Sequence, residues 1–244
     1  MPHPLLEAFA RPTWLELRAP AEARRLGTRA VPLVSGEGRT VVIAPGFLGS
    51  DRSMEPLGRW LTEGGYRVRI ADVESNLRGS SWSVDRIIGA LEESAEPAIL
   101  IGHSRGGQQA RVATQRRPEL VAGLITLGAP FRSHIPRHFA LRAVVESMRL
   151  ANRLGWYFPD DGDDADYAAL LAAPYEAGVA FTSIWSRSDG LVAWQSCADP
   201  AAVGVEVDCS HRGLVASTVA FSAIASAIAQ LGREAPSAGP DPTD

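Results

Sequence analysis

The feature that most constrains the fold is a regular alternation of strand-like and helix-like segments that begins at Arg39. The run RTVVIAP (39–45) is unbroken and rich in β-branched residues, which is typical of a strand buried on both faces. The segment that follows, MEPLGRWLTEGG (54–65), has apolar residues at helical spacing and ends on two glycines. This β-α-β-α order predicts an α/β fold with a mostly parallel sheet and helices on both faces.

The same pattern assigns the rest of the chain. The predicted strands cover 39–45, 66–72, 97–104, 121–130, 179–186 and 203–209, and the predicted helices cover 54–65, 81–96, 105–118 and 213–231. We expect residues 39–232 to form the domain and residues 1–38 to form an arm that packs on it. Residues 131–178 are a long insertion with an amphipathic helix, of the kind that often serves as a lid, and residues 233–244 are expected to be a disordered tail.

Composition and charge limit the classes of binding partner that we expect. The chain has 244 residues, of which 45% are hydrophobic and 21% are charged, and its net charge is -4. This charge gives no electrostatic reason to expect nucleic acid or an anionic membrane as a partner. The most apolar stretch, residues 219–231, is too short for a transmembrane segment, and the start of the sequence lacks the features of a signal peptide. We therefore expect a cytoplasmic protein of unknown oligomeric state.

The pattern GHSRG at 102–106 places Ser104 where a predicted strand meets a predicted helix. In this setting G-x-S-x-G forms a sharp turn that strains the serine backbone and lifts the hydroxyl above the sheet, near the positive end of the helix dipole. We predict that Ser104 is a nucleophile. The alternative is a purely structural glycine-rich turn, because no phosphate-binding glycine motif or P-loop lysine accompanies it.

A serine nucleophile needs a base, and the base needs an acid that fixes its tautomer. His211 directly follows the sixth predicted strand, at the edge where sites of parallel sheets form, and is the predicted base. His103 is expected to point away from the nucleophile. Asp189 follows the fifth strand on a Ser-Asp-Gly turn and is the predicted acid, with Asp199 and Asp208 as rivals.

The order of Ser104, Asp189 and His211, each after a strand, resembles the α/β-hydrolase fold and its lipase/esterase branch in particular. The segments that carry the resemblance are IAPGFLGS (43–50), LIGHSRGG (100–107), SRSDGLV (186–192) and CSHRGLV (209–215). The resemblance implies an oxyanion hole made of the backbone N–H groups of Phe47 and Arg105. It also implies a serine esterase or lipase that requires no cofactor and no metal.

The expected substrate is a small-molecule ester with an apolar acyl chain. A thioesterase or amidase with the same triad, and a catalytically silent binding protein of this fold, are the alternatives. The resemblance also suggests a Cys197–Cys209 disulfide, as in some lipases. It would tie the loop that carries the predicted acid Asp189 (the acid loop) to the loop that carries the predicted base His211 (the base loop). Two free thiols in a reducing cytosol are the other reading. The aspartates between 160 and 166 lack EF-hand spacing, so we expect a solvated turn there.

Overall fold

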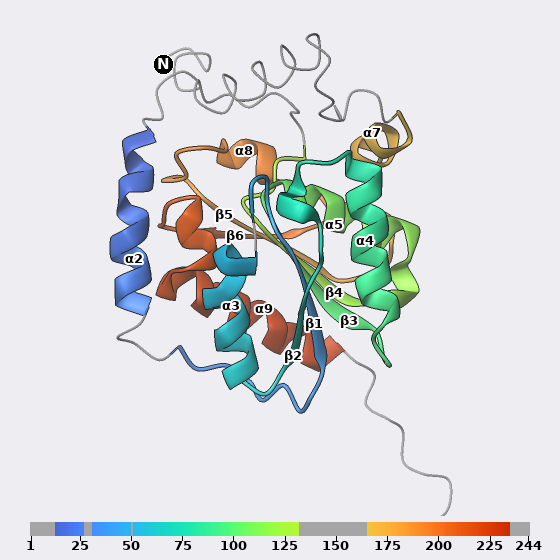
Figure 1. Cartoon of the computed structure of the whole chain (residues 1–244), viewed down its shortest axis with the longest axis horizontal. Helices are drawn as coiled ribbons and strands as arrows, with labels where there is room; N and C mark the ends of the chain where they lie inside the picture. Colours follow the sequence, from blue (N-terminus) through green and yellow to red (C-terminus); the bar gives the residue numbers. More distant parts are fainter. Residues whose placement is uncertain (1–12, 27–30, 50, 132–164, 235–244) are drawn as a thin grey trace, which may run out of the picture.

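The computed structural model describes residues 13–26, 31–49, 51–131 and 165–234. Its centre is a six-stranded sheet in the order β2-β1-β3-β4-β5-β6, in which every neighbouring pair is parallel (Figure 1). The strands are β1 (Thr40–Ala44), β2 (Arg67–Ile70), β3 (Ala98–His103), β4 (Val121–Leu127), β5 (Phe181–Ser186) and β6 (Val203–Val207). Each lies within a predicted strand, so the predicted α/β class is confirmed.

Helices cover both faces of this sheet (Figure 1). Successive side chains of a strand point to opposite faces, so each strand feeds two separate cores. Val41 and Ile43 of β1 pack in the core formed with α3 (Asp51–Glu63) and α9 (Thr218–Glu234). Val42 and Ala44 pack in the core formed with α4 (Ser80–Glu92) and α5 (Arg105–Arg116).

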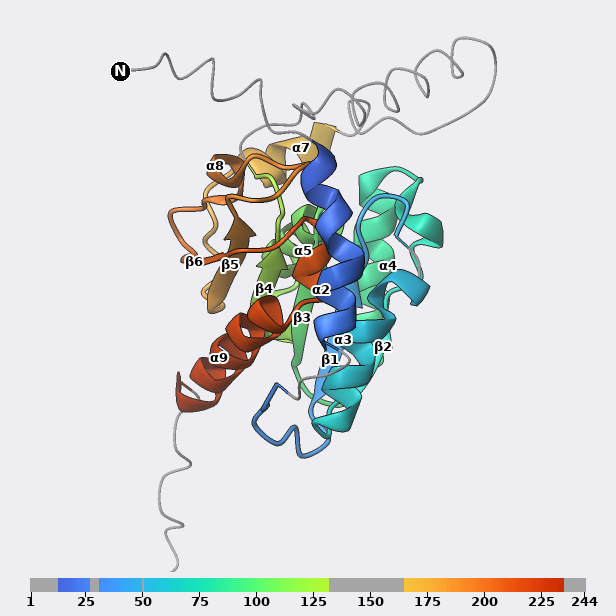
Figure 2. The same cartoon turned by 90° about the vertical axis from the view of Figure 1, so that its left-hand side faces the viewer.

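Several shorter elements surround this framework. They are η1 (Thr13–Arg18), α2 (Ala19–Leu26), η2 (Glu74–Asn76), η3 (Pro118–Leu120), α7 (Ala165–Ala172), α8 (Trp194–Cys197) and η5 (Arg212–Val215). Figure 2 shows α2 on the side of the molecule that carries α3 and α9, and it packs against η5 and α9. None of the helices in the described ranges combines the length and apolar character needed to cross a membrane.

Only part of the predicted insertion at 131–178 belongs to the described residues, chiefly α7, which packs on α5. A buried ion pair between Arg111 Nε of α5 and Asp199, 2.9 Å long, supports this corner, and Arg111 also donates to the carbonyl oxygen of Ala173 after α7. The remainder of the predicted lid (132–164), most of the acidic cluster and tail residues 235–244 lie outside the described residues.

The last helix begins later than predicted. Instead of one helix from Gly213 to Leu231, the chain forms the short η5, breaks at Ala216 (φ -152°), and starts α9 at Thr218. Ser217 caps the start of α9, because its Oγ accepts a hydrogen bond from the Ala220 N–H at 3.3 Å. The apolar spacing continues across this break, so the pattern alone predicted a continuous helix. The break leaves His211 on a separate short turn.

Candidate active site

Ser104 lies in the turn between β3 and α5 with φ 53° and ψ -123°. This backbone conformation is unusual for a residue with a side chain, and it marks a position where the surrounding structure enforces strain. The Ser104 N–H donates to the carbonyl oxygen of Leu127 in β4 at 2.8 Å. Gly106 makes the turn feasible, because a Cβ there would collide with the carbonyl oxygens of Ala44 and Pro45. The predicted strand-turn-helix around Ser104 is therefore present.

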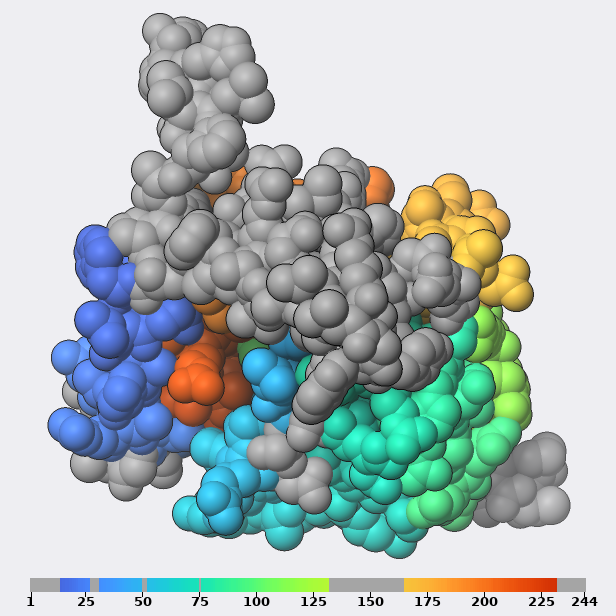
Figure 3. Space-filling view, turned by 45° about the horizontal axis from the view of Figure 1, so that its top comes forward, coloured from blue at the N-terminus to red at the C-terminus, as the bar shows by residue number. Residues whose placement is uncertain are grey.

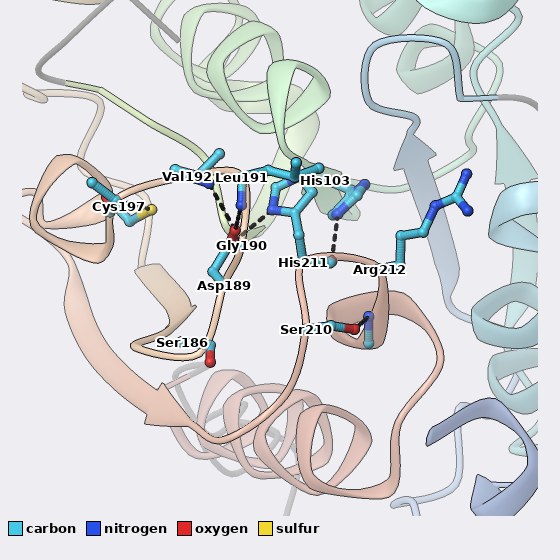
Figure 4. Close-up of polar contacts among 12 residues, drawn as sticks. His103, Ser186, Asp189, Gly190, Leu191, Val192, Cys197, Ser210, His211 and Arg212 are labelled. Atoms are coloured by element: carbon cyan, nitrogen blue, oxygen red, sulfur yellow. Dashed lines mark hydrogen bonds and ion pairs between the residues drawn. The ribbon is translucent and has the colours of Figure 1, made fainter. Parts of the chain in front are cut away.

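Asp189 is held rigidly after β5. The residue is 1% exposed. Oδ1 accepts hydrogen bonds from the N–H groups of Leu191 (2.8 Å) and Val192 (2.7 Å). Oδ2 lies 2.6 Å from Nδ1 of His211 (Figure 4). These contacts use both carboxylate oxygens and aim one of them at the imidazole.

The two rival carboxylates are engaged elsewhere. Asp199 pairs with Arg111, and Asp208 lies 3.2 Å from Nη1 of Arg18. Of the three aspartates considered from the sequence, Asp189 is the one that contacts His211.

His211 is buried between Asp189 and His103 (Figure 4). Burial lowers the pKa of His211, but the charge and hydrogen bond of Asp189, with a further contribution from Glu16, raise it on balance above the ordinary value. A carboxylate only accepts, so Nδ1 carries the proton in this contact. The neutral ring then has its lone pair on Nε2, which is the arrangement that a general base requires.

His103 is a second buried histidine, and it supports the first. Its Nε2 lies 3.1 Å from the backbone carbonyl oxygen of His211, and the two rings are 4.7 Å apart. Since a carbonyl oxygen only accepts, His103 carries a proton on Nε2 and donates it there. Burial, with the proximity of His211, lowers the pKa of His103 to about 3. His103 is therefore neutral near pH 7 and fixes the backbone of His211.

The end of β4 lies between Ser104 and His211. Leu127 accepts the hydrogen bond from the Ser104 N–H, and the next residue, Gly128, lies against the imidazole. A Cβ on Gly128 would come within 3.2 Å of Nδ1 and Cε1 of His211, and its φ of +59° also favours glycine. The segment TLGAP thus brings the two predicted residues to the same edge of the sheet.

The loop that follows β1 packs directly on the serine turn. A Cβ on Gly46 would lie 3.0 Å from Cβ of Ser104. The guanidinium of Arg105 lies 6.0 Å from the centre of the Phe47 ring, so the side chains of the two predicted oxyanion residues are in contact range of each other. Arg105 is the first residue of α5, which places its N–H at the positive end of the helix.

A buried amide pair that the sequence did not reveal holds this loop. The Asn76 side chain donates to the carbonyl oxygen of Pro45 at 2.9 Å and to Oε1 of Gln109 at 2.8 Å. Gln109 donates back to Oδ1 of Asn76 at 2.9 Å, and Arg105 donates to the Asn76 backbone oxygen at 2.6 Å. Both amides are fully buried. They connect η2, the loop after β1 and α5.

The two cysteines are buried free thiols, so the bridge that the resemblance suggested is not formed. Ser183 donates to the carbonyl oxygen of Cys197 at 2.8 Å, and Ser186 donates to that of Cys209 at 2.7 Å. These serines are three residues apart on β5, so they point to opposite faces of the sheet. Burial raises the pKa of both thiols, that of Cys209 to about 12.

A parallel sheet with a strained serine at a strand-to-helix turn, and a hydrogen-bonded Asp-His pair after two later strands, is the arrangement typical of the α/β-hydrolase fold. Residues 39–193, more than half of the chain, match the family model described as the alpha/beta hydrolase fold. The chain belongs to this family.

Solved structures agree with this assignment at the level of the fold. MGS-MChE2, an alpha/beta hydrolase from the metagenome of sediments of the Mar Chica lagoon, Morocco, is 20% identical, with a TM-score of 0.59 over 82% of this chain and 94% of that one. A structure described with the metagenome-derived lipolytic enzymes LipS and LipT is 17% identical (TM-score 0.59; 83% and 96% covered). The thioesterase domain from the curacin biosynthetic pathway is also 17% identical (TM-score 0.54; 80% and 93% covered).

Proposed function

We propose that this protein is a serine hydrolase that cleaves carboxylic esters with Ser104 as nucleophile, His211 as base and Asp189 as acid. The observation that carries the proposal is the 2.6 Å contact between Nδ1 of His211 and Oδ2 of Asp189. This buried pair lies at the edge of the sheet where the strained Ser104 turn also lies. An oriented imidazole at the same sheet edge as the serine of a nucleophile elbow is the arrangement that activates a weak hydroxyl nucleophile.

In this mechanism, Oγ of Ser104 attacks the ester carbonyl carbon while its proton passes to Nε2 of His211. The oxyanion that forms accepts hydrogen bonds from the N–H groups of Phe47 and Arg105, each worth about 10²–10³ in rate. The carbon–oxygen bond to the alcohol then breaks, and the imidazolium returns the proton to the departing alcohol. Water repeats the sequence on the acyl-enzyme and releases the acid and free Ser104.

Asp189 remains an acceptor throughout this sequence. Its Oδ2 stabilises the imidazolium that exists between the two proton transfers, and the two amides on Oδ1 keep the carboxylate from rotating away. No step requires a metal or an organic cofactor.

A thioesterase is the second candidate, and the likeness of the fold to the curacin thioesterase domain favours it. Esters and thioesters yield the same acyl-enzyme, so the two functions differ only in the leaving group. The substrate we propose in either case is a small molecule with an apolar acyl chain.

The test compares wild type with Ser104→Ala on p-nitrophenyl esters of increasing acyl length and on the matching acyl-CoA thioesters. Ser222→Ala, which removes an exposed hydroxyl on α9, is the matched control. We expect a fluorophosphonate probe to label wild type and the control but not Ser104→Ala, and turnover to follow the label. Turnover that survives in Ser104→Ala would rule out this mechanism.

A further inference from the structure

Two carboxylates near the beginning of the described chain reach the loops that carry Asp189 and His211. In the space-filling view, the blue N-terminal segment lies beside an orange-red segment from the last part of the chain (Figure 3). Glu16 of η1 contacts both loops at once. Its Oε1 accepts hydrogen bonds from the N–H groups of Gly190 (3.0 Å) and His211 (2.9 Å), and its Oε2 accepts one from Arg212 (3.2 Å).

Glu22 of α2 holds the residue just before His211. Its two carboxylate oxygens lie 3.1 and 3.3 Å from the backbone nitrogen of Ser210, and Oε2 lies 2.5 Å from the Ser210 hydroxyl. Glu22 is 8% exposed, which is rare for a glutamate without partners. Hydrogen bonds to an ionised carboxylate are among the strong ones, so this contact fixes the start of the base loop.

Both loops have glycine where these carboxylates approach. A Cβ on Gly190 would lie 3.1 Å from Oε1 of Glu16, which is tighter than most such contacts. A Cβ on Gly213 would collide with Oε2 of Glu22. The absence of a side chain at Gly190 and Gly213 therefore lets each glutamate approach the backbone of its loop closely.

We propose that Glu16 is a positioning residue for the reaction, and that its carboxylate joins the acid loop to the base loop and so fixes the distance between Asp189 and His211. Glu22 anchors the base loop beside it. The proposal rests on the proposed function of Ser104, Asp189 and His211. The two glutamates contact backbone, and they act on the reaction only through the loops that they hold.

The charge of Glu16 adds an electrostatic effect to this geometry. Four charged or titratable groups face the ring or backbone of His211: Asp189 from the acid loop, Glu16 from η1, His103 from β3 and Arg212 beside it. Asp189 and Glu16 raise the pKa of His211, whereas Arg212 lowers it. Glu16 therefore favours the imidazolium that forms when the serine proton is transferred.

Two substitutions of Glu16 separate position from charge. Glu16→Gln keeps an oxygen that can accept from the Gly190 and His211 amides but removes the charge. Glu16→Ala removes both. Glu63→Gln, an exposed carboxylate at the far end of α3, removes the same charge away from the site and is the matched control.

We expect Glu16→Ala to lower kcat on a p-nitrophenyl ester about 10–100-fold with KM within about twofold of wild type, because small displacements of catalytic groups are costly. Glu16→Gln should recover most of kcat while the acidic limb of its pH–rate profile moves to lower pH. Glu63→Gln should match wild type. A purely structural role would lower the melting temperature of Glu16→Ala but leave kcat and the pH profile unchanged, and that result would overturn the proposal.

A second measurement is independent of turnover. NMR titration of the histidine rings reports the pKa of His211 directly in folded wild type, Glu16→Gln and Glu16→Ala. We expect the pKa of His211 to fall in both variants and to stay unchanged in Glu63→Gln. If the pKa of His211 falls in both variants but wild type hydrolyses no ester, the proposed function fails while the role of Glu16 in positioning His211 stands. An unchanged titration in both variants would refute that role.

Discussion

Nε2 of His103 donates a hydrogen bond to the backbone carbonyl oxygen of His211, although the two residues are 108 positions apart in the sequence. His103 directly precedes the proposed nucleophile, and His211 is the proposed base. This contact therefore joins the turn that carries Ser104 to the turn that carries His211.

The buried neutral state of His103 predicts how acid affects stability. An unfolded histidine binds a proton below about pH 6.5, whereas folded His103 has a pKa of about 3. Acidification through this window therefore favours the unfolded chain, by about 1.4 kcal/mol per pH unit from this group. His103→Gln should lose less stability than wild type between pH 6.5 and pH 4 in urea unfolding. Parallel curves for the two proteins would contradict the assignment of a neutral His103.

The contact between Asp189 and His211 predicts the pH dependence of activity. The pKa of His211 lies above its ordinary value, and the base must be neutral, so kcat/KM should fall on the acid side at a higher pH than an isolated histidine would give. Asp189→Asn should lower kcat about 10³–10⁴-fold, because the imidazole loses the partner that fixes its tautomer. The acidic limb should also move to lower pH.

The control for this prediction is Asp85→Asn on the surface of α4, where the carboxylate pairs only loosely with Arg116 at 3.5 Å. It should retain the wild-type pH–rate profile. If Asp189→Asn keeps full activity, another carboxylate must serve as the acid.

The backbone of Ser104 predicts a gain in stability when activity is removed. Its φ of 53° and ψ of -123° suit glycine. Relief of backbone strain, about 1–3 kcal/mol, exceeds the entropy cost of glycine, about 0.5–1 kcal/mol. In urea unfolding, the free energy of unfolding of Ser104→Gly should therefore be about 1 kcal/mol higher than that of wild type. The variant should show no detectable turnover. A lower stability than that of Ser104→Ala would show that the strain at this turn is small.

The Asn76–Gln109 pair predicts strongly coupled substitutions. Each single change to alanine leaves the partner amide buried without the two hydrogen bonds that the pair shares, and should cost about 1–3 kcal/mol in unfolding free energy. Asn76→Ala also removes the hydrogen bond that supports the loop of Phe47 at Pro45, so kcat should fall in that variant as well. The double variant should cost clearly less than the sum of the singles. Additive losses in a double-mutant cycle would show that the two amides act independently.

The buried free cysteines predict that a reducing agent does not change the thermal stability of the protein. Because the thiols of Cys197 and Cys209 are free and buried, dithiothreitol should leave the melting temperature unchanged. A disulfide reagent that forms a coloured product should report two thiols in denaturant and almost none in the native protein, since burial raises both thiol pKa values. A melting temperature that falls on reduction would indicate a bridge.

The sequence predicted features that depend on short segments. β-branched runs located the strands, the GHSRG pattern located the turn of Ser104, and single residues after the fifth and sixth strands pointed to Asp189 and His211, because parallel strands bring their carboxyl ends to one edge. Local spacing failed where a break interrupts an apolar pattern, as at Ala216. The prediction of a cysteine bridge was wrong, because spacing in the sequence does not show against which face of β5 each cysteine packs.

The supporting contacts could not be predicted in this way. Glu16 and Glu22 act across separations of 174 to 196 residues, and no local pattern distinguishes them from other glutamates on a surface helix. Asn76 carries a positive φ of 52° in a short η2 segment and bonds to Pro45, 31 residues before it. Such partners follow from the packed tertiary structure, because only it decides which backbone groups meet which side chains.

The contacts of Glu16 and Glu22 also have a consequence for how the protein is made. The ribosome synthesises both glutamates well before Ser210 and His211, so their carboxylates remain without these partners during most of translation. Contacts of such long sequence separation form late, because long chain loops must close first. We therefore expect the proposed catalytic groups to come together only after the final turn and α9 have joined the sheet, so that chains truncated before His211 lack the proposed activity.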